Sequence, residues 1–290
     1  MSGPDPQAAR STASRPRILI AAFEGWNDAG DAASGVVDHL LATWPTERLI
    51  ELNSEDYYDY QVNRPLVDVD ESGVRTIAWP STYVELATPA DLSQDLLLVR
   101  GIEPSMRWQA FSAELVDLSK RLNVEMAITL GALLADSPHT RPIPITGTSS
   151  DPQLRERLGY EPSRYRGPTG IVGVLQQAFS NAGIPSVSLW AAVPHYVAAP
   201  PCPTATLALL SRIEDVVDMS IPTGDLPEES RAWQRGVDEL TADDEELSEY
   251  VRSLEEARDT SDLPEASGEE IAREFERYLR RRGTGAPDQG

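Results

Sequence analysis

The sequence predicts an α/β protein with three layers, in which a mainly parallel β-sheet lies between helices. Three observations lead to this prediction. Short apolar runs of strand length alternate along the chain with segments whose apolar residues recur at helical spacing. Several of these runs, such as Asp95–Gly101, are continuously apolar, as expected of strands that are covered on both faces. The chain has 290 residues, of which 40% are hydrophobic, and this is enough to bury a substantial core.

The predicted strands are rich in aliphatic, β-branched and aromatic residues, which fit a pleated and partly buried surface. They cover residues 18–23, 48–52, 74–79, 83–87, 95–101, 125–130, 142–146 and 185–193. The predicted helices carry apolar residues three and four positions apart, which places these residues on one face. They cover the stretch from the loop at Asp31 to Leu41, and residues 108–122, 152–158, 171–179 and 204–217.

A β-hairpin is predicted to interrupt the alternation of strands and helices. Residues 74–79 and 83–87 flank the turn Pro80-Ser-Thr82, and their spacing and composition favour pairing with each other. A hairpin within such a series is usually an insertion. Its exposed edges, together with Trp79 and Tyr83, make it a candidate for contacts between copies of the chain.

The chain divides into four predicted parts. Residues 1–16 are polar, lack the apolar centre of a signal peptide, and are expected to be disordered. Residues 17–222 form the α/β core, with the hairpin insertion at about 74–87. Residues 223–282 form an acidic helical extension, and residues 283–290 form a disordered tail.

The extension carries its apolar residues in two narrow helical stripes, which are separated by residues 262–268. The first stripe consists of Val237, Leu240, Leu247, Val251 and Leu254, and the second of Ile271, Phe275 and Leu279. Because these faces are narrow, we expect the extension to dock on another surface or to pair with itself.

The net charge limits the classes of partner. The chain carries 25 basic and 47 acidic residues, which gives a formal charge of −22 at pH 7. Such a surface repels nucleic acids and anionic membranes, so neither is an expected partner. The single cysteine, Cys202, excludes a disulfide framework, and the expected location is cytoplasmic.

Polar side chains gather where several predicted strands end. The carboxyl ends of parallel strands share one edge of an open α/β sheet, and ligands bind at that edge. We therefore expect these loops to form a cleft. The predicted ligand-binding residues are Glu24, Asn27, Asp28, Gly131, Thr146, Thr148, Thr169, Gly170 and His195.

Each of these positions also has an ordinary structural explanation. Asn27 or Asp28 can cap the helix that follows, so capping and ligand binding stay open alternatives. The turn Gly167-Pro-Thr-Gly170 opens a helix whose free N–H groups offer an anion site, or it is a simple turn with a threonine cap. His195 is a candidate general base oriented by Glu24 or Asp28, and equally a hydrogen-bonded structural residue.

The remaining histidines add little to this picture. His139 is a weaker candidate of the same kind as His195, and His39 is expected to be structural. The three histidines lack the spacing of a metal site, so no metal and no cofactor are predicted. A nucleophile elbow and a phosphate-binding Walker loop are also absent from the sequence. The catalytic residues are therefore unknown, and enzymatic activity stays open.

Three segments carry a family resemblance. They are Phe23-Glu-Gly-Trp-Asn-Asp-Ala-Gly-Asp-Ala-Ala33, Thr129-Leu-Gly-Ala132 and Gly167-Pro-Thr-Gly170. These segments resemble the PAC2 (proteasome assembly chaperone 2) family, in its actinobacterial branch with an acidic helical C-terminus. The resemblance covers most of residues 17–220.

The resemblance implies a three-layer core related in topology to phosphorylases and hydrolases. It further implies a hairpin that assembles a homotrimer and a C-terminal helical lid over a cleft. Relatives assist proteasome assembly, so proteasome subunits are implied partners. Some relatives dock through a terminal hydrophobic-Tyr-x motif, which residues 286–290 do not match, so docking by that route is not expected.

Three functions remain as hypotheses at this point, and one of them is that the acidic C-terminal helices form a partner-binding surface. The first is a non-catalytic, chaperone-like role in assembly, linked to the proteasome. The alternative is a small-molecule-binding enzyme, of a hydrolase or phosphorylase type, that uses the cleft beneath the lid. Because the expected cleft is acidic, a cationic or hydroxyl-rich ligand would suit it.

Overall fold

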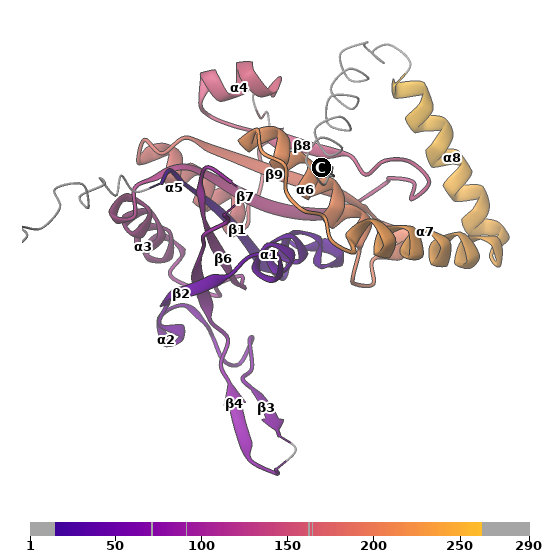
Figure 1. The fold of residues 1–290 in the computed structure, drawn as a ribbon. Helices are drawn as coiled ribbons and strands as arrows, with labels where there is room; N and C mark the ends of the chain where they lie inside the picture. The colour runs from indigo at the N-terminus through magenta and orange to yellow at the C-terminus, as the bar shows by residue number, and fades with distance from the viewer. Residues whose placement is uncertain (1–14, 71, 91, 162, 164, 263–290) are drawn as a thin grey trace, which may run out of the picture.

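The structure is a computed structural model that describes residues 15–262, except residues 71, 91, 162 and 164 (Figure 1). The strands are β1 (Arg17–Glu24), β2 (Thr46–Glu51), β3 (Leu66–Val69), β4 (Arg75–Ala78), β5 (Thr82–Ala87), β6 (Asp95–Ile102), β7 (Val124–Ala135), β8 (Ile145–Thr148) and β9 (Ser186–Pro194). The helices are α1 (Ala32–Thr43), α2 (Ser54–Tyr57), α3 (Trp108–Arg121), α4 (Pro152–Leu158), α5 (Ile171–Asn181), α6 (Pro203–Val217), α7 (Leu226–Ala242) and α8 (Glu245–Asp262), with short 3₁₀ turns η2 (Ala29–Asp31) and η3 (His195–Val197).

Seven strands form the main sheet, in the order β2-β5-β6-β1-β7-β9-β8. The four central strands β6, β1, β7 and β9 run parallel to one another. At the edges, β5 and β8 run antiparallel to β6 and β9, and β2 runs antiparallel to β5. The loop from β5 to β6 is too short for the crossover that a parallel pair requires. The sheet is therefore parallel at its centre and antiparallel at its edges.

Helices cover both faces of the sheet, which confirms the predicted three-layer architecture. Buried side chains of α1 and α6 pack on one face, and those of α3 and α5 pack on the other. The central strands are buried on both faces, since all but the end residues of β1 have almost no exposed surface. The continuous apolar runs of the sequence indicated these covered strands correctly.

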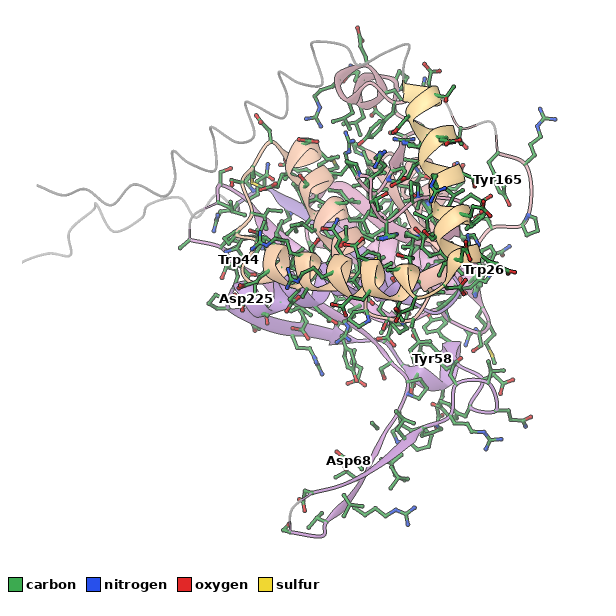
Figure 2. All side chains as sticks on the ribbon, turned by 90° about the vertical axis from the view of Figure 1, so that its right-hand side faces the viewer. Trp26, Trp44, Tyr58, Asp68, Tyr165 and Asp225 are labelled. Carbon is green, nitrogen blue, oxygen red and sulfur yellow. The ribbon has the colours of Figure 1, made fainter. Side chains whose placement is uncertain are left out.

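The predicted pairing of the hairpin is wrong. Residues 75–78 pair with Leu66–Val69, and Leu66 lies opposite Ala78. The second predicted arm, residues 82–87, joins the main sheet between β2 and β6. The true hairpin is β3–β4, and it projects from the body of the protein in both views (Figures 1 and 2). Alternating β-branched residues mark a strand but do not identify its partner.

The acidic extension begins with two helices, α7 and α8, whereas the first predicted stripe requires one continuous helix. Helix α7 ends at Ala242, and Asp244 starts α8 because its carboxylate accepts a hydrogen bond from the Leu247 N–H at 3.1 Å. Leu240, which was expected on the first stripe, is consequently 63% exposed. The second predicted stripe and the predicted tail lie outside the described residues. Within the described part of the chain, no helix combines the length and apolar character needed to cross a membrane.

Candidate functional site

The loops that follow the central strands meet at one edge of the sheet. The loop after β1 lies against β7, because the Ala132 N–H donates a hydrogen bond to the Asn27 carbonyl at 2.7 Å and Asp28 bridges to Ala132. The loop after β6 joins them, since the Glu103 N–H donates to the Glu24 carbonyl at 2.9 Å. The prediction that Glu24, Asn27 and Asp28 lie at this edge is therefore confirmed.

The carboxylate of Asp28 accepts hydrogen bonds from the first turn of the helix that follows it. One carboxylate oxygen accepts from the N–H groups of Ala33 at 2.7 Å and Ser34 at 3.2 Å, and the other accepts from the Ser34 hydroxyl at 2.5 Å. Only 4% of Asp28 is exposed, and burial raises the pKa of its carboxyl group. The structure thus shows Asp28 in the capping role that the sequence left as one alternative.

Asn27 and Glu103 together fill the N-terminus of α5. The Asn27 amide donates to Glu103 Oε1 at 2.5 Å, and the same oxygen accepts from the Ile171 N–H at 2.9 Å. Gly170 permits this arrangement, because a Cβ atom there would overlap the Asn27 side chain. The chain itself therefore fills the predicted anion site at Gly167–Gly170. The anion at the start of α5 is the Glu103 carboxylate.

Thr146 and Thr148 do not lie at this edge, so that part of the prediction is wrong. Strand β8 runs antiparallel to β9, and Thr148 lies beside Ser188 near the start of β9. Its end therefore points to the opposite edge of the sheet from the loops after β1 and β7. The expectation assumed that this short strand was parallel to its neighbours.

The other glycine and threonine candidates contact packing residues. A Cβ atom at Gly131 would lie 2.6 Å from the Trp190 ring, so this glycine allows the indole to cross the strand. Thr169 makes no capping hydrogen bond to α5, and its hydroxyl reaches only the Gly170 carbonyl at 3.5 Å. Whether these residues bind a ligand stays a prediction.

His195 pairs with a residue other than those predicted. Its Nδ1 lies 3.3 Å from Asp136 Oδ1 and 3.4 Å from the Ala135 carbonyl, and its ring lies 5.5 Å from the Tyr250 ring. Neither Glu24 nor Asp28 is among the hydrogen-bond partners that the described residues provide for this imidazole. The histidine therefore links the end of β9 to α8.

A cleft of about 830 Å³ lies beside Glu24, between α1, Arg100 of β6 and the beginning of α7. Its carboxylate side chains are Glu24, Asp31, Asp38, Asp225 and Glu229. Arg100 lies among them, with Nε 2.8 Å from Asp38 and Nη2 3.5 Å from Glu24. Burial raises the pKa of Glu24 and Asp38, and the Arg100 charge opposes that shift. His39 also lines the cleft and bonds to the Pro222 carbonyl at 2.7 Å, which fits its expected structural role.

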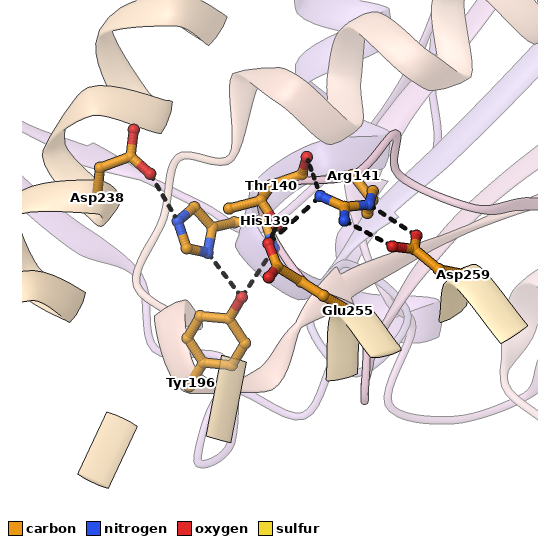
Figure 3. Close-up of polar contacts among 7 residues, drawn as sticks. All are labelled: His139, Thr140, Arg141, Tyr196, Asp238, Glu255 and Asp259. Atoms are coloured by element: carbon orange, nitrogen blue, oxygen red, sulfur yellow. Dashed lines mark hydrogen bonds and ion pairs between the residues drawn. The ribbon is translucent and has the colours of Figure 1, made fainter. Parts of the chain in front are cut away.

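A second polar cluster fastens α7 and α8 to the loop after β7 (Figure 3). Buried His139 is held at both ring nitrogens, with Nδ1 2.8 Å from the Tyr196 hydroxyl and Nε2 3.0 Å from Asp238 of α7. The Tyr196 oxygen already accepts the His139 N–H at 2.7 Å. Its own hydrogen is thus free to bond Nδ1, which favours the tautomer that presents Nε2–H to Asp238.

Helix α8 is fastened through the next two residues of the same loop. Arg141 donates two hydrogen bonds to Asp259, at 2.9 and 2.8 Å, and one to Glu255 at 3.3 Å. The Thr140 hydroxyl also donates to Glu255. The guanidinium of Arg141 holds the pKa of Asp259 below its usual value. The acids of the extension therefore serve in part to dock it on the core.

Sequence reasoning missed Glu103, Arg100 and Arg141, and it ranked His139 below His195. Glu103 follows a buried strand, as Glu24 does, so its position was a usable signal. The partners of Arg100 and Arg141 lie far away in the chain, and no local pattern indicates them.

The chain is similar to a known family along most of its length. The model described as the PAC2 family matches residues 22–241. No curated protein matches the chain.

Solved structures extend this similarity. A PAC2 family protein from Streptomyces avermitilis is 56% identical, covers 81% of this chain and 99% of its own, and gives a TM-score of 0.76. A proteasome-assembly chaperone homologue from Mycobacterium tuberculosis is 49% identical, with the same two coverages and a TM-score of 0.75. An archaeal homologue of proteasome-assembly chaperone from Pyrococcus furiosus is 17% identical, covers 84% of this chain and 96% of its own, and shares the fold with a TM-score of 0.52.

Proposed function

Because the chain belongs to the PAC2 family, we propose that it is a non-catalytic assembly chaperone whose partners are proteins, with proteasome subunits as the first candidates. The similarity to the Mycobacterium tuberculosis proteasome-assembly chaperone homologue supports the chaperone role. The cytoplasmic location and the relation to phosphorylases and hydrolases stay predictions.

The observation that carries a protein-binding role is the uncovered β3–β4 hairpin. Val67 lies opposite Ile77, and both side chains are about half exposed, as are those of Val69 and Trp79. An isolated two-stranded hairpin is only marginally stable in water, so an apolar hairpin needs a surface to pack against. We propose that copies of the chain cover these residues in a homotrimer.

The sheet edge supports the same proposal from another direction. The carboxylates of Asp28 and Glu103 accept hydrogen bonds from the starts of α1 and α5, and the Asn27 amide N–H donates to Glu103, while Asn27 Oδ1 has no partner among the described residues. Residues 223–282 are proposed as a separate extension, of which α7 and α8 form a lid held by Arg141 and His139. Because side-chain contacts hold this lid on the core, breaking them would release the lid and give a protein partner access to the surface beneath it.

The test measures self-association and binding to proteasome α subunits together. Ile77→Asp should convert the homotrimer to monomer in sedimentation analysis, because it places a charge on the apolar face of the hairpin. Leu240→Asp is the matched control, since Leu240 is an exposed aliphatic residue, as Ile77 is, but lies on α7. If the wild-type chain neither binds α subunits nor changes the rate at which they assemble, the chaperone proposal is wrong.

Binding of a small ligand, with or without enzymatic turnover, is a second candidate function. The specific observation behind it is the cleft of about 830 Å³ beside Glu24. Spermidine, as a cationic probe, should raise the melting temperature of the wild-type chain, and Asp38→Asn should abolish the rise. Glu239→Gln, which removes an exposed acid of α7 outside the cleft, should not. The absence of any shift with the wild-type chain would count against this candidate.

A further inference from the structure

A groove with a volume of about 740 Å³ runs between α3 and α5, which cover the same face of the sheet (Figure 1). Small and aliphatic residues form much of its lining, and Ala113, Gly173, Val174 and Ala178 are among them. The groove lies on the face of the sheet opposite to α1 and α6, so it is separate from the acidic cleft. No segment of the described chain fills it.

One polar side chain of the groove lacks a partner in the single chain. Ser112 lines the groove and is 3% exposed, yet its hydroxyl has no hydrogen-bond partner among the described residues. Ser119, on the same helix, shows the usual alternative, because its hydroxyl donates to the Leu115 carbonyl at 2.7 Å. Buried hydroxyl groups are almost always hydrogen-bonded, so Ser112 indicates an acceptor that comes from outside the single copy.

Asp117 is the only charged residue among the described residues that line the groove. It is exposed, and its carboxylate has no hydrogen-bond or ion-pair partner in the described part of the chain. Asp117 follows Ser112 by five residues on α3, so the two side chains lie about 140° apart around the helix axis. They cannot meet within one copy, because side chains on one helix meet at spacings of three or four residues. A second copy can bring its Asp117 to the Ser112 hydroxyl.

The face of α3 between these two side chains carries the spacing of a helix pair. Gln109, Ala113, Val116 and Lys120 follow one another at intervals of four, three and four residues, so they form one stripe along α3. Alternating intervals of four and three are the repeat of two helices that pack side by side. Ser112 precedes one position of the α3 stripe and Asp117 follows the next. In a parallel helix pair, residues at these two flanking positions meet across the interface.

The direction of the second helix follows from the two flanks of the α3 stripe. A two-fold axis parallel to α3 places the Ser112 flank of each copy against the Asp117 flank of the other, so both hydrogen bonds form at once. A two-fold axis across α3 reverses the second helix and places each flank against its own kind. The Ser112 hydroxyls then stay unpaired, and the two Asp117 carboxylates share one flank. Only the parallel arrangement therefore satisfies both side chains.

We propose that two copies of this chain pack their α3 helices in parallel about a two-fold axis, with each α3 in the groove of the other copy and each Ser112 donating to the other copy's Asp117. This contact goes beyond the proposed function and does not use the hairpin. Ala113 lies at the centre of the α3 stripe and keeps the two helices close, so the short serine and aspartate side chains can meet. Lys120 lies one residue before the end of α3, where its ammonium group reaches water. A single charged residue in such a stripe costs stability and fixes the register.

The contact is expected to be weak. The α3 stripe is about 18 Å long, so the buried area is small. Two chains that each carry a formal charge of −22 also repel one another. A covalent trap is therefore the suitable measurement, made on the full-length chain at raised ionic strength, which screens this repulsion.

Cross-linking of introduced cysteines tests both the contact and its direction. In the parallel pair Gln109 of one copy lies beside Gln109 of the other, so a short bis-maleimide should link Gln109→Cys chains into a covalent dimer. In the reversed pair Gln109 lies beside Lys120. A mixture of Gln109→Cys with a size-tagged Lys120→Cys chain should therefore give links between like variants. Links mainly between the two different variants would overturn the proposal.

Two features of the chain provide the background for this measurement. Cys202 is buried, and burial raises the pKa of its thiol to about 11, so the native cysteine does not compete. Ala232→Cys, at an exposed alanine of α7, is the control that should give no adduct. An adduct of equal yield with Ala232→Cys would overturn the proposal.

The same trap in the Ile77→Asp background separates this contact from the proposed hairpin assembly. Because the hairpin takes no part in the two-fold contact, the Gln109→Cys adduct should persist when Ile77→Asp is added. Loss of the adduct in that background would show that it arises through the hairpin assembly, and would overturn the two-fold contact. A failure to bind proteasome subunits would contradict the proposed function and leave this contact standing.

A double-mutant cycle tests the pairing of Ser112 with Asp117. Ser112→Ala and Asp117→Ala, each in the Gln109→Cys chain, should raise the protein concentration that gives half-maximal adduct by about tenfold, because each removes a hydrogen bond to a charged group. The double variant should lose no more than either single variant, since both changes remove the same bond. Ser119→Ala is the matched control, because the Ser119 hydroxyl bonds within its own helix. Additive losses, or an equal loss in Ser119→Ala, would contradict the pairing.

Discussion

Replacement of Asp28 by alanine distinguishes a structural carboxylate from a ligand-binding one. The Asp28 carboxylate accepts three hydrogen bonds at the start of α1, from the N–H groups of Ala33 and Ser34 and from the Ser34 hydroxyl. In Asp28→Ala the N–H groups of Ala33 and Ser34 lose this acceptor, and the Ser34 hydroxyl keeps only the Asp31 carbonyl at 3.4 Å, at a site where Ser34 is 4% exposed. Water therefore cannot readily replace the missing oxygen atoms.

The expected loss of stability follows from these contacts. Loss of a helix cap costs about 1 kcal/mol. A buried donor left without an acceptor costs about 1–3 kcal/mol more. Because burial raises the pKa of Asp28, the ionised carboxylate already carries a desolvation cost, and this offsets part of the loss. We expect the free energy of unfolding to fall by about 2–3 kcal/mol.

Thermal and urea unfolding followed by circular dichroism measures this loss. At about 2–4 °C per kcal/mol for a domain of this size, the melting temperature should fall by about 4–12 °C. Asp31→Asn is the control, because the adjacent Asp31 makes no capping hydrogen bond and asparagine tolerates its positive φ of 50°. A fall of less than about 0.5 kcal/mol for Asp28→Ala would refute the capping argument and favour a ligand-binding role.

Three further predictions concern close contacts and the docking of α8. Gly170→Ala should lower the free energy of unfolding by about 1–3 kcal/mol, measured by urea titration, because its methyl group displaces the Asn27 amide from Glu103; an unchanged midpoint would contradict this. Gly131→Ala should lower the free energy of unfolding by about 1–3 kcal/mol and shift the fluorescence of Trp190, because the added Cβ would lie 2.6 Å from the Trp190 ring. The control Gly236→Ala adds a methyl group in open space. The Arg141 contact keeps the folded-state pKa of Asp259 below its unfolded value, so that contact stabilises the docked α8 at neutral pH and is lost as the pH falls through the folded-state pKa. The protection of the α8 amides, expressed relative to the intrinsic exchange rate at each pH, should therefore fall on acidification in the wild-type chain. It should already be low at neutral pH in Arg141→Ala, and equal protection in both chains would refute the docking role of Arg141.

Local sequence signals predicted the helices closely. Helix α4 begins and ends at the expected residues, because Asp151 caps it, Pro152 occupies its first turn and Gly159 ends it in a left-handed conformation. These three residues act within one turn of the positions that they control. For the same reason the covered central strands were recognisable from their unbroken apolar runs.

Strand pairing was harder to predict from the sequence than the positions of the helices. Residues 75–78 and 82–87 are neighbours in the chain, yet they belong to two different sheets. Both segments have strand composition, and composition does not identify the partner of a strand. The direction of β8 was missed in the same way, which moved Thr146 and Thr148 to the wrong edge of the sheet.

The sequence by itself determined the fold class, the approximate positions of most strands and helices, and the acidic loop after the first strand. Only the tertiary structure decided what the side chains of that loop do. Asn27 meets Glu103 across 76 residues of chain, and Arg141 meets Asp259 across 118. Helix and strand signals depend on neighbours a few residues apart, whereas the partner of a polar side chain depends on how distant segments pack. The same carboxylate in the same local sequence can therefore face a ligand, cap a helix or hold a lid, and the packing of the whole chain selects among these roles.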